Sequence, residues 1–104
     1  MPAHFIVRAE VRDAADRAKF DQWYQTEHLP DAVTAFKVKR AWRGWSQVDP
    51  AVHVAVYEFE SLAAAKAGTG AEVLKPLIAE FDRVWGARVT RARDLVDIAQ
   101  TIAG

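Results

Sequence analysis

Hydrophobic and polar residues alternate along residues 4–11, which indicates an extended segment with one buried side. Phe5, Val7, Ala9 and Val11 share one side of this segment. A period of two with branched side chains is typical of a β-strand. Similar alternation over residues 37–47, 52–59 and 87–99 predicts three further strands. Both sides of residues 52–59 are largely apolar, which is typical of a central strand covered on both faces.

The stretch after the first strand changes to the period of a helix. Asp13 can accept a hydrogen bond from the first helical turn. The apolar stripe of this helix is formed by Phe20, Trp23, Tyr24 and His28. Pro30 disfavours helical backbone at the preceding residue, so we expect the helix to end near His28. Asp31 can cap a short second turn that reaches about Phe36.

A second helical region follows the third strand. Ser61 is expected to cap a short alanine-rich helix over residues 62–67, and residues 68–70 interrupt it. A longer helix is expected over residues 71–85. Its apolar stripe is formed by Leu74, Leu77, Ile78, Phe81, Val84 and Trp85.

The expected order is strand, helix, strand, strand, helix, strand, which is the ferredoxin-like βαββαβ arrangement of an α+β fold. We expect residues 1–104 to form one such domain, with a four-stranded antiparallel sheet and helices on one face. Two helices cover only one face of that sheet, yet the strands carry apolar residues on both. A homodimer with the two sheets packed face to face would cover the open side.

Composition narrows the choice of partners and compartment. The 104 residues include 14 Lys and Arg and 14 Asp and Glu, so the formal net charge is zero. Nucleic acids and anionic membranes both favour proteins with a basic excess, so we expect neither partner. The absence of cysteine excludes disulfides, thiolate metal sites and a cysteine nucleophile. We find no targeting signal and no membrane-spanning stretch, and we expect a cytoplasmic protein.

The residues Trp23-Tyr24 followed by Glu27-His28-Leu29-Pro30 resemble the W-x(n)-E-H-[LI]-P signature of small dimeric α+β barrel proteins, in particular the EthD-like branch. The stretch from Trp85 to Arg91 is similar to the start of the last strand in such proteins. In element order the resemblance covers about residues 5–99. It implies a dimeric α+β barrel, a superfamily of cofactor-free monooxygenases, lactone isomerases, polyketide cyclases, dehydratases and haem-handling enzymes. Fold kinship does not choose among these activities.

His28 is the first candidate for catalysis. Its stripe faces the sheet, and a half-buried imidazole with a pKa near neutral suits acid–base work. The resemblance implies that this histidine lines the pocket. The alternative is a structural histidine whose ring bonds a backbone carbonyl near Pro30.

Two further residues are candidates for catalysis alongside His28. A reaction through an enolate needs a base at carbon and a cation or donor at oxygen. His53 is a candidate second acid or base, unless it lies at a strand end in solvent, and Arg40 or Arg88 is a candidate oxyanion partner. The alternating arginines of residues 88–93 are expected to flank a solvated or interfacial edge.

Several aromatic residues are candidates for a flat apolar pocket. Those selected as substrate-binding residues are Trp23, Tyr24, Trp42 and Tyr57. Trp42 and Tyr57 share strand faces with polar residues, Arg40 and His53 respectively. The alternative is that these aromatic side chains only fill the core and the dimer interface.

We therefore predict a small cofactor-independent enzyme that acts on an aromatic or polyketide-like molecule by isomerisation, cyclisation, dehydration or oxygenation. No cofactor or metal is expected, because the histidines lack metal-ligand spacing and no glycine-rich nucleotide motif follows a strand. One alternative is a non-catalytic ligand-binding or stress-associated barrel, and another is a haem-handling barrel with His28 as axial ligand. An enzyme should show His28 facing open space with its other nitrogen held. A binding protein should show a pocket without a positioned base.

Overall fold

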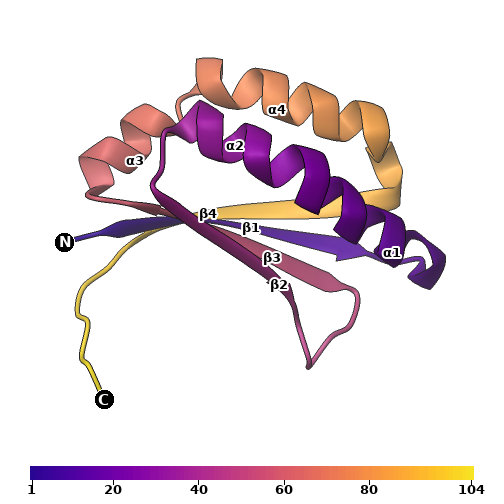
Figure 1. The fold of residues 1–104 in the computed structure, drawn as a ribbon, viewed down its shortest axis with the longest axis horizontal. Helices are drawn as coiled ribbons and strands as arrows, with labels where there is room; N and C mark the ends of the chain where they lie inside the picture. The colour runs from indigo at the N-terminus through magenta and orange to yellow at the C-terminus, as the bar shows by residue number, and fades with distance from the viewer.

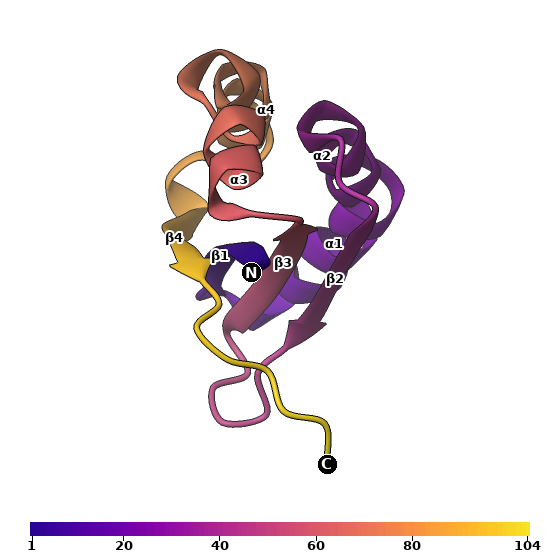
Figure 2. The same cartoon turned by 90° about the vertical axis from the view of Figure 1, so that its left-hand side faces the viewer.

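Four strands form a single antiparallel sheet in the order β2-β3-β1-β4. The computed structural model describes residues 1–104. The strands are β1 (Ala3–Val11), β2 (Arg40–Trp45), β3 (Val52–Phe59) and β4 (Val89–Asp97). The helices all lie on one side of this sheet (Figures 1 and 2). The predicted ferredoxin-like α+β fold is confirmed, with β3 and β1 at the centre of the sheet.

The pleat of the strands separates the two faces of the sheet. The face toward the helices carries the core residues of β1 and β3, including Phe5, Val7, Ala55 and Tyr57. We call the other side the open face. Its apolar and aromatic residues are Ile6, Trp42, Val52, Val54, Val56, Ala92 and Val96, and it is without a helix (Figure 2). No helix covers the open face of β3, so the prediction that this strand is covered on both faces depends on a second copy of the chain and stays a prediction.

The first helical region continues through Pro30 and does not end near His28 as predicted. It consists of α1 (Ala14–Trp23), a single π-helical turn (Tyr24–His28) and α2 (Leu29–Phe36). In the π turn the Leu29 N–H donates to the carbonyl of Tyr24, five residues back. Proline disrupts a regular α-helix because it lacks an N–H and its ring meets the carbonyl four residues earlier. The π turn, which changes that bonding pattern, ends two residues before Pro30 and leaves the proline in the first turn of α2.

The π turn also keeps one side of the bent helix on the sheet. Phe20 and Ala32 are twelve positions apart and both are buried. At about 100° per residue, a regular α-helix would place them about 120° apart around its axis. A π turn takes up about one extra residue, which brings the two side chains to within about 20°. The turn therefore aligns the buried faces of α1 and α2.

The remaining helices agree with their predicted caps. Asp13 accepts a hydrogen bond from the Ala15 N–H at the start of α1, and Ser61 accepts one from the Ala64 N–H at the start of α3 (Leu62–Gly68). α4 spans Ala71–Val84, and a short 3-10 turn (Gly86–Arg88) connects it to β4. None of these helices has the length and hydropathy that crossing a bilayer requires.

Gly68 is fixed by close packing at the end of α3. A Cβ atom at this position would lie 2.6 Å from Cε1 of Phe59 and 3.2 Å from the carbonyl oxygen of Phe36. Phe59 is buried, so it has little room to move aside. We expect Gly68→Ala to lower the free energy of unfolding by about 1–3 kcal/mol through overpacking, measured by urea denaturation. Gly70→Ala is the matched control, because its Cβ would meet nothing closer than 3.7 Å. Equal stability of the two variants would contradict the expectation.

Candidate functional site

His28 is held in an aromatic setting by the π turn. Trp23 lies five positions earlier, a spacing that puts side chains about 140° apart in an α-helix. In the π turn the two rings stack instead, with centroids 4.7 Å apart and planes 21° apart. Tyr24 and Phe81 meet the His28 ring edge-on, at centroid distances of 4.9 and 5.6 Å. The ring is therefore positioned by aromatic contacts on several sides.

Burial keeps the His28 imidazole neutral. Desolvation, and next the positive charge of Arg91, lower the pKa of His28 to about 4, against a weaker opposing effect of Glu80. No hydrogen bond is among the influences on this pKa. The pKa is therefore well below the near-neutral value expected from the sequence. At pH 7 the ring is a free base.

His28 lines a cleft between the helices and the sheet, which we call the His28 cleft. It encloses about 340 Å³ with its open mouth included, of which about 30 Å³ is wide enough for the centre of a water molecule. Its polar side chains are His28, Tyr57, Arg91 and Arg93. Its apolar walls come from Phe5 and Val7 of β1, Ala32 and Phe36 of α2, and Leu74, Leu77, Ile78 and Phe81 of α4. The cleft is thus narrow, mostly apolar and lined by a few convergent polar groups, as ligand sites commonly are.

Arg91 brings a cation into this cleft from β4. Its guanidinium carbon lies 3.9 Å from the centre of the Phe81 ring, and Nη2 donates to Oδ1 of Asp82 at 2.6 Å. Its side chain is only 15% exposed. Of the two settings predicted for the arginines of residues 88–93, a solvated or an interfacial edge, the solvated one is therefore wrong for Arg91.

The alternation of side chains along β4 predicts this placement. Arg91 and Arg93 are an even number of positions from Val89 and Leu95, which belong to the core side of β4. In the sheet they pair with the core residues Ala9 and Val7. Alternation along β4 therefore puts both arginines on the helix side.

Two buried phenols lie beside the cleft. Burial raises the pKa of Tyr24 to about 12 and raises the pKa of Tyr57 strongly. Each tyrosine also affects the pKa of the other. Both phenols therefore stay protonated at neutral pH, and the hydroxyl of Tyr57, which lines the cleft, donates to that of Tyr24.

His53 belongs to a polar cluster beyond Tyr24, whose ring centre is 4.4 Å away. It is completely buried, contrary to the alternative of a solvated strand end. The Nη1 atom of Arg43 lies 3.2 Å from His53 Nε2 and donates to Asp21 at 2.7 Å. Because a guanidinium only donates, Nε2 of His53 accepts and the proton sits on Nδ1, which has no partner. Burial, and next Arg43, lower the pKa of His53 to about 4.

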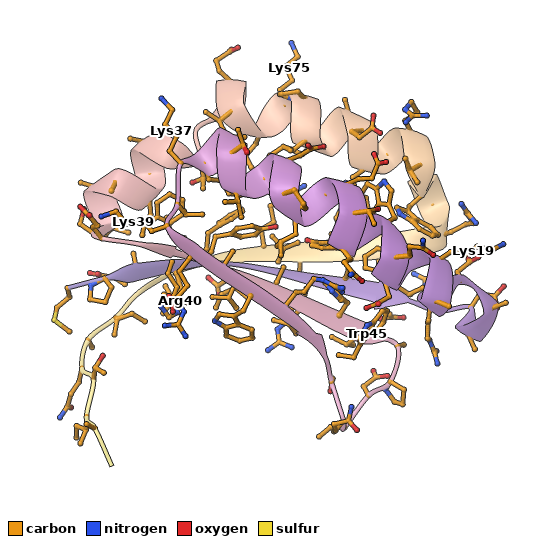
Figure 3. All side chains as sticks on the ribbon, viewed as in Figure 1. Lys19, Lys37, Lys39, Arg40, Trp45 and Lys75 are labelled. Carbon is orange, nitrogen blue, oxygen red and sulfur yellow. The ribbon has the colours of Figure 1, made fainter.

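The structure divides the sequence-predicted site residues into two groups. One group lies on the helix side of the sheet and consists of Trp23, Tyr24, His28, Tyr57 and His53. Arg40 and Trp42 lie on the open face, where Arg40 pairs with Glu58 at 3.2 Å. Figure 3 shows Arg40 on the side away from the helices. The structure therefore does not bring Arg40 or Trp42 together with His28.

The surroundings of His28 bear on the alternative of an axial haem ligand. The ring stacks against Trp23 and contacts Tyr24 and Phe81, and only about 30 Å³ of the adjoining space is wide enough for the centre of a water molecule. A flat macrocycle does not fit these residues as they stand. No group of three His, Cys, Asp or Glu side chains is placed to hold a metal ion.

Solved structures share this fold along almost the whole chain. No family model and no curated protein matches the sequence. The chain is similar to SnoaB, a cofactor-independent oxygenase from Streptomyces nogalater, at 16% identity and a TM-score of 0.69, covering 99% of this chain and 98% of SnoaB. An EthD family protein from Bacillus halodurans matches at 13% identity and a TM-score of 0.67, covering 90% and 97%. A NIPSNAP family protein of unknown function from Agrobacterium tumefaciens matches at 12% identity and a TM-score of 0.67, covering 94% and 89%.

Likeness at this level of identity shows the fold. The neighbours have ferredoxin-like α+β structures of the kind that the strand and helix order predicted. They include an oxygenase and a protein without known function, so kinship of fold leaves the activity open. The signature from Trp23 to Pro30 stays a prediction, because no family model matches the sequence.

Proposed function

We propose that this protein is a cofactor-independent enzyme that moves a proton on an aromatic or polyketide-like molecule held in the His28 cleft. The observation that carries the proposal is a neutral imidazole lining an apolar cleft beside the cationic Arg91. A base and a cation in one water-poor space are what abstraction of a proton next to a carbonyl requires. One protein of similar structure, SnoaB, is a cofactor-independent oxygenase, which favours an enzyme that needs no cofactor.

The residues take distinct roles in this reaction. His28 accepts the proton from an activated carbon, and the electron pair of the broken C–H bond moves to the carbonyl oxygen. Arg91 stabilises the resulting oxyanion, as a cationic donor in a low-dielectric site does. Protonation at a second carbon completes an isomerisation, while reaction of the carbanion with O₂ gives oxygenation.

The low pKa of His28 fits a base that works only with ligand bound. In the empty cleft a ring with a pKa of about 4 is a weak base. An oxyanion that forms nearby raises the pKa of His28 by favouring its charged form. The base therefore gains strength as the charge of the transition state develops.

A ring-sized substrate requires the cleft to widen. Leu77, Ile78 and Phe81 of α4 form one wall of the cleft. Movement of these side chains, together with α4, is the simplest way to admit an aromatic ring.

Non-catalytic ligand binding is the second candidate function. The observation that favours it is that His28 is positioned by stacking, with no hydrogen bond to hold its second nitrogen. A catalytic histidine is commonly oriented by such a bond. In this case the cleft would hold an apolar molecule without changing it.

Deuterium exchange distinguishes the two candidates without knowledge of the natural substrate. Anthrone and an unsaturated γ-lactone each carry an acidic C–H next to a carbonyl. We expect the protein to speed exchange of that proton in anaerobic D₂O, followed by NMR. Binding of both probes without faster exchange would support the binding function and overturn the proposal. In air, anthrone and O₂ should then give anthraquinone and water.

We also propose that two copies associate through the open face. Apolar side chains of this face include Ile6, Val54 and Trp42, which is 47% exposed. Exposed contiguous apolar surface of this kind is typical of an association site. A second copy would cover it with the same surface, as two-fold symmetry requires.

Light scattering after size exclusion tests the association. We expect a dimer at micromolar concentration and a monomer for Trp42→Glu, because the carboxylate would be buried in the interface. Val48→Glu introduces the same charge at a side chain that is 96% exposed in the β2–β3 loop. A wild-type monomer, or equal dissociation of both variants, would contradict the proposal.

A further inference from the structure

The His28 cleft carries more positive charge than the chain neutralises. Arg91 and Arg93 both line it, two positions apart on the same side of β4. Asp82 pairs with Arg91 at 2.6 Å. Arg93 is exposed, so it borders the cleft from the solvent side, and no carboxylate of the chain lies within ion-pair distance of it. With His28 neutral, these groups leave one formal positive charge at the cleft.

The two guanidinium groups are close enough to repel one another. The charge of Arg93 is among the causes that lower the pKa of Arg91, after desolvation. A like-charge pair beside an apolar space is stabilised by an anion that lies between or beside them. Asp82 is the only carboxylate within ion-pair distance of either arginine, and it is bonded to Arg91.

We propose that the ligand of the His28 cleft is an amphipathic monoanion, an aromatic body that bears one carboxylate, and that Arg93 is the residue that binds this carboxylate. The inference rests on the proposed function for the location of the site. The apolar walls would take the ring system. The planar guanidinium of Arg93 matches a carboxylate in shape and can bind it through two parallel hydrogen bonds.

The charge count selects a carboxylate over a phosphate. One unpaired guanidinium matches one negative charge, whereas a phosphate monoester brings nearly two. The negative charge of the ligand would also increase the base strength of His28. A carboxylate near Arg93 offsets the positive field that contributes to the low pKa of His28, so the base strengthens when the correct ligand is bound.

A pair of fluorescent probes with one ring system tests the inference. The probes are 9-anthracenecarboxylate and 9-anthracenemethanol, which differ in charge and share the anthracene body. We expect the wild-type protein to bind the acid about tenfold more tightly than the alcohol at low salt, as measured by fluorescence anisotropy. Arg93→Gln should remove that preference and leave the affinity for the alcohol unchanged.

Lys75→Gln is the matched control, because it removes the same charge from the outer side of α4 (Figure 3), outside the cleft lining. It should bind both probes like the wild type. Circular dichroism checks that each variant is folded. Raising the salt concentration should narrow the preference for the acid, because screening weakens a partly exposed ion pair.

Every result of this titration decides the inference. Equal affinity for the two probes in the wild type, no binding of either probe, or an unchanged preference in Arg93→Gln would each overturn it. Exchange of the neutral anthrone tests the proposed function separately. Exchange of anthrone without an Arg93-dependent preference would support the proposed enzyme and contradict the anionic ligand. An Arg93-dependent preference without exchange of anthrone would support the anionic ligand and contradict the proposed enzyme.

Discussion

Replacement of His28 by phenylalanine is expected to slow protein-promoted exchange at the acidic carbon of anthrone by a factor of about 10² to 10⁴, the usual contribution of a general base. Phenylalanine keeps a flat apolar ring next to Trp23, Tyr24 and Phe81 and removes the basic nitrogen. The substitution therefore separates the chemistry of His28 from its packing. The measurement is the rate of deuterium incorporation in anaerobic D₂O at pD 7.

His4→Gln is the control for this experiment. His4 is paired with Glu58 on the open face, on the other side of the sheet from the cleft. Its replacement should leave exchange unchanged at protein concentrations where association is intact. If His28→Phe exchanges anthrone as fast as the wild type, His28 is not the base. The cleft would then be better described as a binding site.

Acidification from pH 7 to pH 4.5 is expected to destabilise the fold by several kcal/mol. Burial is the main reason that the pKa values of His28 and His53 fall to about 4 in the folded chain, while an unfolded histidine titrates near 6.5. Between these values the unfolded chain binds more protons than the folded one, so stability falls as the pH falls. The full shift corresponds to about 3 kcal/mol for the buried His53, and to less for the half-buried His28 because solvent screens it.

Urea denaturation at half-unit steps between pH 7.5 and 4.5 measures this effect. The free energy of unfolding should be nearly level above pH 7 and fall steadily below about 6.5. His28→Phe should show a shallower fall, because only His53 then contributes. Asp21 contributes in a separate, more acidic window. The hydrogen bond from Arg43 lowers the pKa of Asp21 below 3.8, so its contribution is lost only below that pH. A level profile from pH 7 to 5 would contradict the assignment of neutral buried histidines.

Local rules were sufficient for much of the fold. Alternation gave the core side of β1, and the capping roles of Asp13 and Ser61 follow from residue types that accept hydrogen bonds from free N–H groups. The rule for Pro30 failed because it describes a regular α-helix. The change of hydrogen bonding in the π turn depends on packing of two helical segments on one sheet, which no local pattern contains.

The candidate site was predictable only in part. His28 was placed on the buried side of its helix by spacing alone. The sequence suggests Arg40 or Arg88 as the cation and not Arg91, although Arg91 alternates in step with Val89 and Leu95 on the core side of β4. Which alternate residues of β2 and β4 face the helices is fixed by the pairing of β2 with β3 and of β4 with β1. That pairing puts Arg91 inside the cleft and Arg40 on the open face. The unusually low pKa of His28 also depends on neighbours from α4 and β4 that are distant in sequence.

The π turn makes Pro30 depend on the number of residues before it as much as on their identity. Removal of one residue from Tyr24–His28 would restore ordinary α-helical bonding and leave the buried faces of α1 and α2 aligned, because eleven steps of about 100° put Phe20 and Ala32 about 20° apart, as the π turn does. Pro30 would then lie inside a regular α-helix, where its ring meets the carbonyl four residues earlier at a cost of about 3 kcal/mol. A homologue with a one-residue gap at this point is therefore expected to have another residue in place of the proline.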